Sequence, residues 1–262
     1  MEGVTTKFCA VILAAGRSTR FKSRKGVSKI LHPLCGIPMI EHILRTLTRL
    51  SPEQMLVVLS PDLVDEFRRH YGSMYEVAVQ EDALGTGDAL SCALPHITNE
   101  VDYVLVLPGD APLVTGKAIS EVLTNASGGD GAVLTFVPSS PRGYGRILRD
   151  SENHFILKII EESETDEETA SITECNSGIY AFHRKWISSA LERAREECGT
   201  KNAKGEYFLT DVVNFLRIVP VQYEPYVDLV GVNDRVDLAR VETVLQERKI
   251  SELAREGVTF VR

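Results

Sequence analysis

The first apolar segment of the chain, with the loop of small residues that leaves it, constrains the fold more than any other feature. Residues 8–13 (FCAVIL) are apolar without alternation, which is typical of a parallel strand buried on both faces. They run directly into Ala14–Gly16 and then into a polar loop that reaches Lys29. Small residues let backbone N–H groups approach an anion, and Arg20 and Lys29 can supply positive charge. The stretch favours a phosphate-bearing ligand at the carboxyl end of the first strand, although a plain tight strand exit has the same composition.

Two common phosphate-binding motifs are missing at this place. The sequence has no G-x-x-x-x-G-K-[ST], and no G-x-G-x-x-G follows the first strand. A P-loop and a dinucleotide-binding fingerprint are therefore both unsupported.

The composition argues against several other classes of protein. A net charge of −8, without a basic run interleaved with aromatic residues, argues against a nucleic-acid binder. No apolar run approaches the length of a membrane span, and the start of the chain lacks the apolar core of a signal peptide. The five cysteines are scattered and include no C-x-x-C pair, so neither a zinc site nor a disulfide framework is indicated. We therefore expect a cytoplasmic protein that binds neither nucleic acid nor membranes.

Apolar segments alternate with amphipathic ones over the first half of the chain. After the first strand, the pattern predicts strands at 55–59, 76–80, 101–107 and 131–137, and helices at 39–50, 62–70, 88–94 and 115–125. This alternation predicts an α/β fold, Rossmann-like, with a mostly parallel, doubly wound sheet.

The pattern changes after residue 137. A hairpin is expected at 144–149 and 155–160, followed by a strand at 177–182, a helix at 183–197 with Trp186 inward, a helix at 210–216, strands at 219–224 and 228–230, and a closing helix at 233–249. The closing helix carries an apolar stripe of Val236, Leu238, Val241 and Leu245. We expect one domain over 1–262, with a nucleotide-binding part at about 1–137, a β-rich sugar-binding part at 138–230, and a closing helix and tail at 231–262.

Several polar residues stand at the carboxyl ends of predicted strands, where ligands of open α/β sheets bind. Asp110 follows an apolar strand and suits Mg²⁺, which takes few protein oxygens and several from phosphates and water. Gln80 and Gly85–Thr86 suit a nucleobase or phosphate, and Glu161 suits sugar hydroxyls. Each is equally compatible with a helix cap, a turn or a solvated position. The residues alone indicate a Mg²⁺-dependent α/β enzyme that handles phosphates or nucleotides.

Eight motifs occur together and in a characteristic order: VILAAGRSTR, SKILHPLCGIPM, ALGTGDA, LPGDAPL, GYGRILRD, ECNSGIYAF, NAKGEYFLTD and GVNDR. In this combination the chain resembles the uridyltransferase (pyrophosphorylase) domain of the bacterial bifunctional N-acetylglucosamine-1-phosphate uridyltransferase / glucosamine-1-phosphate acetyltransferase family. The resemblance runs from about Phe8 to the end. It implies the fold of the nucleotide-diphospho-sugar transferases. It also implies transfer of UMP from UTP to N-acetylglucosamine 1-phosphate, which gives UDP-N-acetylglucosamine and pyrophosphate for cell-wall synthesis.

The same resemblance implies the role of each site residue. Nucleotide binding falls to Leu13, Ala14, Ala15 and Gly16; uracil recognition to Gln80, Gly85 and Thr86; sugar binding to Gly145, Glu161 and Asn176; Mg²⁺ binding to Asp110 and Asn233; and neutralisation of the triphosphate to the catalytic Arg20 and Lys29. Gly109 and Thr210 complete the expected substrate-binding set.

The chain departs from this family at a few places. Ser18 stands where the family usually has Gly, Ser28 where it has Pro, and Asp88 where it has His, and the span from Arg20 to Lys29 is longer than usual. No hexapeptide repeats follow, so we expect no acetyltransferase activity and, without the β-helix they would form, a monomer. Two rival hypotheses stay open: a nucleotidyltransferase with another base or sugar, and a catalytically impaired module that binds nucleotide sugars.

Overall fold

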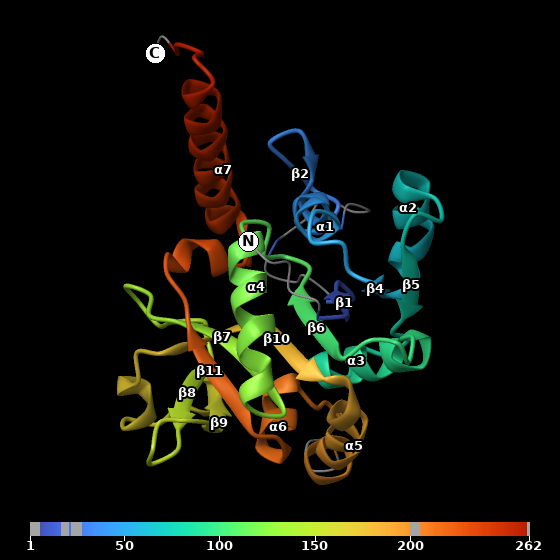
Figure 1. Cartoon of the computed structure of the whole chain (residues 1–262), viewed down its shortest axis with the longest axis vertical. Coiled ribbons are helices and arrows are strands. Elements are labelled where there is room, and N and C mark those ends of the chain that lie inside the picture. The colour runs from blue at the N-terminus through green and yellow to red at the C-terminus, as the bar shows by residue number, and fades with distance from the viewer. Residues whose placement is uncertain (1–5, 17–20, 22–27, 200–204, 261–262) are drawn as a thin grey trace.

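The apolar segment at the start of the chain forms β1 (Phe8–Leu13), with the bounds that the sequence predicts. The computed structural model describes residues 6–16, 21, 28–199 and 205–260 (Figure 1). Within these residues, β1 belongs to a nine-stranded sheet. It pairs in parallel on one side with β4 (Gln54–Leu59) and on the other with β6 (Tyr103–Pro108).

Seven of its strands follow the order β11-β7-β10-β6-β1-β4-β5, and most neighbours along this path are parallel. The edge strand β5 (Glu76–Val79) is parallel to β4, and β11 (Ile218–Gln222) is parallel to β7 (Gly131–Phe136). Between β7 and β6, β10 (Cys175–His183) runs antiparallel to both. The prediction of a Rossmann-like, mostly parallel sheet is confirmed.

Helices cover both faces of the sheet. The α-helices of the described residues are α1 (Met39–Thr48), α2 (Pro61–Tyr71), α3 (Thr86–Ala93), α4 (Gly116–Asn125), α5 (Arg184–Ala194), α6 (Leu209–Val212) and α7 (Arg235–Arg255). None of these described helices is both long and apolar enough to cross a membrane.

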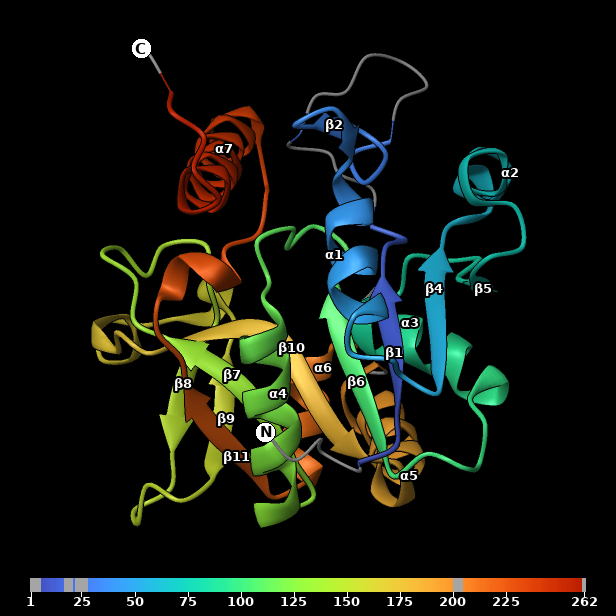
Figure 2. The same ribbon diagram turned by 45° about the horizontal axis from the view of Figure 1, so that its top comes forward.

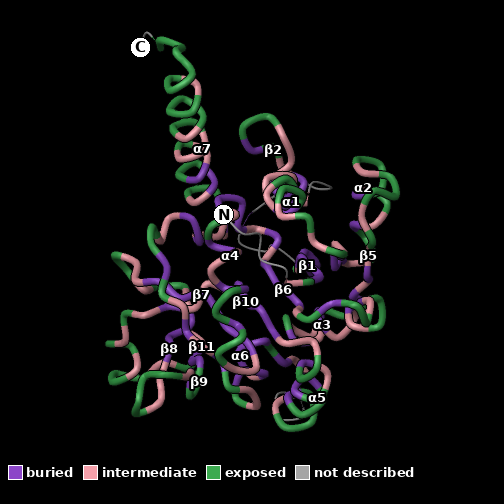
Figure 3. Tube along the Cα trace, in the orientation of Figure 1, coloured by how far each residue is buried: buried purple, intermediate pink, exposed green. Residues whose placement is uncertain are grey.

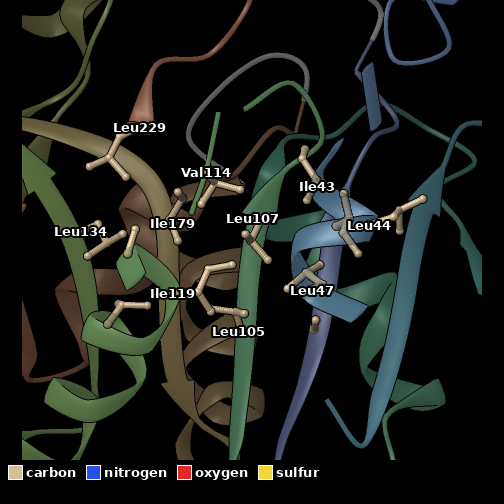
Figure 4. Packing of buried hydrophobic residues seen from close by; sticks show 14 of the residues in the cluster. Ile43, Leu44, Leu47, Leu105, Leu107, Val114, Ile119, Leu134, Ile179 and Leu229 are labelled. Atoms are coloured by element: carbon tan, nitrogen blue, oxygen red, sulfur yellow. The ribbon is translucent and has the colours of Figure 1, made fainter. Parts of the chain in front are cut away.

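Alternation along β1 divides the core into two layers. Ala10 and Ile12 pack with residues of α1, α2 and α4 on one face, whereas Cys9 and Val11 pack with residues of α3, α5 and α6 on the other. All four side chains are fully buried. Figure 4 shows the first layer, where side chains of α1 meet those of β6 and α4. Burying a Leu or Ile side chain contributes about 1.5–3 kcal/mol, so the two layers hold β1 firmly in the centre.

Helical periodicity accounts for the covering helices. Ile40, Ile43, Leu44 and Leu47 recur at the spacing of one helix face, and all four are buried in α1. The start of α4 is also as predicted, because the side chain of Thr115 caps it by accepting from the backbone N–H of Ala118 at 3.2 Å.

The order of the strands creates a switch point between β1 and β6. From β1 the chain moves outward to β4 and then β5, and after α3 it returns to β6 on the other side of β1. The connections that leave the carboxyl ends of β1 and β6 therefore diverge. Ligands of open α/β sheets bind in the crevice that such a divergence leaves.

The expected β-rich insert lies at the end of the sheet that carries β7 and β11, on the left in Figure 2. Its hairpin consists of β8 (Arg146–Arg149) and β9 (Ile156–Ile160), as predicted. The hairpin joins the main sheet where Arg146 pairs with Cys175 of β10.

The closing helix α7 projects from the body of the protein (Figures 1 and 3). In its first half, Leu238 and Val241 join a small third core with Phe21, Met39 and Val232. Its outer turns are exposed (Figure 3).

A buried ionic network ties α7 to the body. Asp228 accepts hydrogen bonds from Arg248 of α7, from the Tyr223 hydroxyl at 2.9 Å and from the Thr115 hydroxyl at 3.3 Å. Arg248 also donates to the carbonyl of Leu113 at 2.8 Å. Asp228 is 5% exposed, so its charge depends on these partners.

Three predictions of the sequence analysis are wrong here. Residues 228–230 are not a strand: Asp228 lies in the 3₁₀ helix Tyr226–Leu229, a position from which its carboxylate contacts Arg248, Tyr223 and Thr115. Trp186 is 41% exposed, since the buried face of α5 is formed by Ile187 and its helical neighbours. Val236 is 57% exposed because it lies off the stripe that continues from Leu238.

A substitution tests the network that holds α7. Asp228→Ala should lower the free energy of unfolding by about 1–3 kcal/mol, because Arg248 then keeps only the Leu113 carbonyl as acceptor and the two hydroxyls keep only each other. Urea denaturation measures the change. The matched control is Glu252→Ala, which removes an exposed pair with Lys249 and should cost less than about 0.5 kcal/mol. Equal losses in the two variants would show that the network does not anchor the helix.

Candidate active site

A cleft of about 1000 Å³ opens at the switch point. The ends of β1 and β6 meet at its base, where Leu13 is the register partner of Pro108 and its carbonyl accepts from Gly109 N–H at 2.8 Å. A Cβ on Gly109 would lie 3.0 Å from both the Leu13 carbonyl oxygen and the Ala14 Cβ. Gly109 therefore serves the close approach of the two strand exits, and it is not among the residues that line the cleft.

The loop of small residues leaves β1 beside the cleft. Leu13, Ala15 and Gly16 line the cleft. Ala14 does not: it is buried in the first core layer, and its N–H donates to the Val58 carbonyl at 2.9 Å. Ala14 thus anchors the loop to the core and to β4. Arg20, which follows this loop, lies outside the described residues.

A second group of predicted residues forms a turn between β5 and α3. Gln80, Gly85 and Thr86 all line the cleft. The Gln80 side-chain nitrogen donates to the Gly85 carbonyl at 3.0 Å and to the Asp88 carboxylate at 2.8 Å. The turn therefore holds this amide in one orientation.

Residues 205–210 hold this turn from the other side. Gly87 N–H donates to the Tyr207 carbonyl at 3.2 Å, and Leu209 N–H donates to the Thr86 hydroxyl at 3.0 Å. Gly85 has a φ of +99°, and a Cβ there would lie 2.2 Å from the Tyr207 carbonyl oxygen. Glycine is required at this position by both the backbone conformation and the contact.

The predicted sugar-binding residues lie on the opposite wall. Glu161 and Asn176 line the cleft with Thr210, whose hydroxyl donates to the Glu161 carboxylate at 2.8 Å. Gly145 supports them from behind, because its carbonyl accepts from Asn176 N–H at 2.9 Å and its own Cβ position is 3.1 Å from Ile159. Burial raises the pKa of Glu161, the Thr210 hydrogen bond opposes this, and two nearby carboxylates add to the rise.

The two predicted metal ligands lie at the same edge of the sheet. Asp110 accepts through its backbone carbonyl from Val232 N–H at 2.8 Å, and Val232 immediately precedes Asn233. Lys29 is 9% exposed, forms an ion pair with the Asp110 carboxylate, and donates to the Val232 carbonyl at 3.0 Å. Lys29 thus joins the end of β6 to the segment that carries Asn233. Asn233 N–H donates to Asp237 at 3.0 Å.

The structure also places residues in the cleft that the sequence analysis did not assign. These are Lys158, Tyr180, Glu206 and Phe208, all of which line it. Position 208 lies within a recognised motif, in which only Thr210 was assigned a role. Nothing in the local sequence marks Lys158, because a Lys on an edge strand is an ordinary solvated residue.

The charge of the cleft is mostly negative over the residues that the structure describes. Its described lining includes the carboxylates of Asp110, Glu161, Glu164, Glu206 and Asp211. Against them it includes one cationic side chain, Lys158, while Lys29 is paired with Asp110 behind the lining. A strongly anionic ligand therefore needs further positive charge at this place.

The raised pKa of Glu161 predicts how one substitution changes stability with pH. A carboxyl group whose pKa is higher in the folded than in the unfolded state stabilises the fold below its unfolded pKa, and this contribution is lost as pH rises through the folded pKa. Glu161→Gln should therefore raise stability at pH 8, and the gain should shrink near pH 4, about the pKa of an unfolded Glu. Gln can still accept from Thr210.

Urea denaturation at the two pH values measures this effect. Glu167→Gln is the control, because it removes the same charge from a residue that is exposed. If Glu161→Gln were less stable than the parent by the same amount at pH 4 and pH 8, the claim that burying the Glu161 charge destabilises the fold would be refuted.

Comparison with known proteins identifies the family of the chain. Residues 10–207 match the family of MobA-like NTP transferase domains. The chain is 40% identical to the Bifunctional protein GlmU of Heliobacterium modesticaldum over 262 aligned residues, which cover 97% of this chain and 56% of the relative. It is 36% identical to the proteins of the same name from Geobacillus thermodenitrificans and Bacillus subtilis over 259 aligned residues, which cover 96% of this chain and 55% of each relative. The chain thus spans about half the length of these curated relatives.

A solved structure shares the fold at low sequence identity. The inositol-1-phosphate CTP transferase from T. maritima superimposes with a TM-score of 0.69 at 15% identity, covering 92% of this chain and 96% of that one. The matched region includes most of β1, all of β6, the turn after β5 and the hairpin, whereas the cleft residues from Phe208 to Asn214 lie beyond it. The chain belongs to the MobA-like NTP transferase family, and its resemblance to the bifunctional GlmU proteins is confirmed.

Proposed function

We propose that the protein transfers UMP from UTP to N-acetylglucosamine 1-phosphate and releases pyrophosphate, with Mg²⁺ as its cofactor. One arrangement carries the proposal. Asp110 lines a single cleft and is paired from behind with Lys29, and the same cleft is lined by the Gln80–Thr86 turn on one wall and by Glu161 on the other. A nucleotide and a sugar phosphate bound on these two walls would meet at Asp110.

The proposed reaction needs little acid or base catalysis from side chains. An oxygen of the sugar phosphate is already anionic, so it needs no general base to attack the α-phosphorus of UTP. The bond between that phosphorus and the oxygen bridging to the β-phosphate breaks, and pyrophosphate leaves with the electron pair. Catalysis of such a step rests on in-line alignment and on neutralising the phosphates.

The donors at Asp110 suit Mg²⁺. An Asp carboxylate and an Asn amide supply oxygen atoms, and Mg²⁺ commonly takes one or two protein carboxylates and completes its shell with phosphates and water. A Cβ on Gly231 would lie 3.5 Å from the Asp110 carboxylate, so the absence of a side chain keeps space beside that oxygen. The described residues contain no cluster of three or more His, Cys, Asp or Glu side chains, as would suit a metal held by protein alone. When bound, Mg²⁺ would offset phosphate charge; Asp110 and Asn233 would hold it.

Lys29 and Arg20 are proposed to neutralise the triphosphate. Lys29 already bonds both Asp110 and the Val232 carbonyl, so it holds its charge at the base of the cleft. The excess of carboxylates around the cleft makes this positive charge necessary for any triphosphate to bind.

The base and the sugar are proposed on separate grounds. Uracil is assigned from the kept LGTG turn and Gln80, and N-acetylglucosamine from Glu161, Asn176 and Gly145. The second candidate is transfer of a different nucleotide or to a different sugar phosphate. The fold supports it, because the protein from T. maritima is named for CTP and inositol 1-phosphate.

Pyrophosphate release from each NTP, paired with a panel of sugar 1-phosphates, tests the proposal. We expect UTP with N-acetylglucosamine 1-phosphate to give the highest kcat/KM, and release to stop when EDTA removes Mg²⁺. Faster turnover with another NTP or with glucose 1-phosphate would assign the protein to the second candidate. Binding of UDP-N-acetylglucosamine without release for any pair would indicate the catalytically impaired module.

A substitution tests the role of Asp110. Asp110→Asn should lower kcat by about 100-fold or more, because it removes a charge from the proposed metal site. Circular dichroism should show the same fold. Asp82→Asn is the control, since Asp82 is exposed beyond β5, and it should keep near-normal turnover. Near-normal turnover of Asp110→Asn would refute the assignment.

A further inference from the structure

The orientation of the Gln80 amide is fixed by two acceptors. Gln80 is 5% exposed, and its backbone N–H extends the sheet by donating to the Leu59 carbonyl at 2.9 Å. Its side-chain nitrogen donates to the Gly85 carbonyl and to the Asp88 carboxylate. A primary amide has two N–H groups, and neither acceptor can donate in return. Turning the amide over would put its oxygen against two other oxygens, so the nitrogen must face them.

The two acceptors are themselves held in place. The Gly85 carbonyl also accepts from Ala89 N–H at 3.1 Å in the first turn of α3. Asp88 lies in the same turn, and Gly85 and Gly87 are packed against Tyr207. The Gly85 oxygen cannot move away from Gln80 without disturbing the start of the helix, and the Asp88 carboxylate extends from a backbone position fixed in that same turn.

We infer that Asp88 is a positioning residue that sets base selectivity by leaving Gln80 only its oxygen to offer a ligand. With both N–H groups engaged inside the protein, the amide can accept a hydrogen bond from a base but cannot donate one. Uracil has an N–H at N3, between its two carbonyls. Cytosine has an unprotonated N3 there, which would face the Gln80 oxygen with a second lone pair. Asp88 therefore favours UTP over CTP without touching either.

This inference rests on the proposed function only in taking Gln80 as a contact to the base. Asp88 stands where the resembled family usually has His. A His ring could accept through one nitrogen or donate through the other, whereas a carboxylate accepts only. The chain therefore carries a stricter constraint on Gln80 than the usual residue would provide.

The test is a double-mutant cycle read as a selectivity ratio. The kcat/KM for UTP and for CTP is measured at saturating N-acetylglucosamine 1-phosphate for the parent, Asp88→Ala, Gln80→Ala and the double variant. Because both constants come from one preparation, their ratio does not depend on the folded fraction. We expect Asp88→Ala to lower the UTP/CTP ratio by about tenfold or more, the effect of one misplaced hydrogen bond. The loss should lie in KM for UTP more than in kcat.

Coupling to Gln80 separates positioning from a general structural effect. In the Gln80→Ala background, Asp88→Ala should leave the ratio unchanged, because there is no amide left to orient. Glu81→Ala, which removes a neighbouring exposed charge, should keep the parental ratio. The inference is refuted if Asp88→Ala keeps the parental ratio, or if it lowers the ratio equally in both backgrounds. A parent that prefers CTP would instead overturn the proposed function itself.

Discussion

Burial of β1 on both faces is the constraint on which the rest of the structure depends. Cys9 to Ile12 are fully buried between two helical layers, so the strand cannot shift its register without moving apolar side chains into the wrong layer. Its neighbours β4 and β6 are thereby fixed as well. Because the chain turns one way from β1 and the other way from β6, the crevice between their ends follows from the strand order. The cleft is thus a consequence of core packing.

The walls of the cleft depend on contacts between segments far apart in the sequence. Residues 205–210 lie against the turn that carries Gly85 and Thr86, and they also bring Thr210 to Glu161. One segment therefore contacts both the Gly85–Thr86 turn and the Glu161 carboxylate. Gly85 leaves no space for a side chain against this segment, so the contact between the two is close. Three motifs distant in sequence thus meet in one part of the fold.

The sequence predicts the parts of this protein that are decided locally. An unbroken apolar run gives β1, a helical stripe gives α1, and Thr115 caps α4. Positions decided by tertiary contacts are less predictable. Trp186 is apolar but lies off the buried face of its helix. Residues 228–230 form a turn, in which Asp228 forms an ion pair with Arg248 of another element.

The candidate site divides in the same way. Residues at strand ends, such as Asp110 and Gln80, can be located from the pattern because parallel strands end at one edge. Lys29 could be proposed as a cation, but its pairing with Asp110 depends on how a loop folds back over the sheet. Lys158 could not be found, since its place in the cleft is set by the insert. Asp88 was visible only as a departure from a motif, and its bond to Gln80 gives that departure a physical reason.

The charge of the cleft sets a condition that any substrate must meet. A triphosphate entering a site lined by five described carboxylates is repelled unless cations accompany it, and burial strengthens that repulsion because the local dielectric is low. Pairing Lys29 with Asp110 neutralises one carboxylate while no ligand is bound, which avoids an isolated buried charge. Under the proposed function, the same Asp110 would have to be shared between Lys29 and the proposed metal once phosphate oxygens arrive. Binding of nucleotide and metal should therefore be interdependent, because each supplies charge that the other needs before it can enter the cleft.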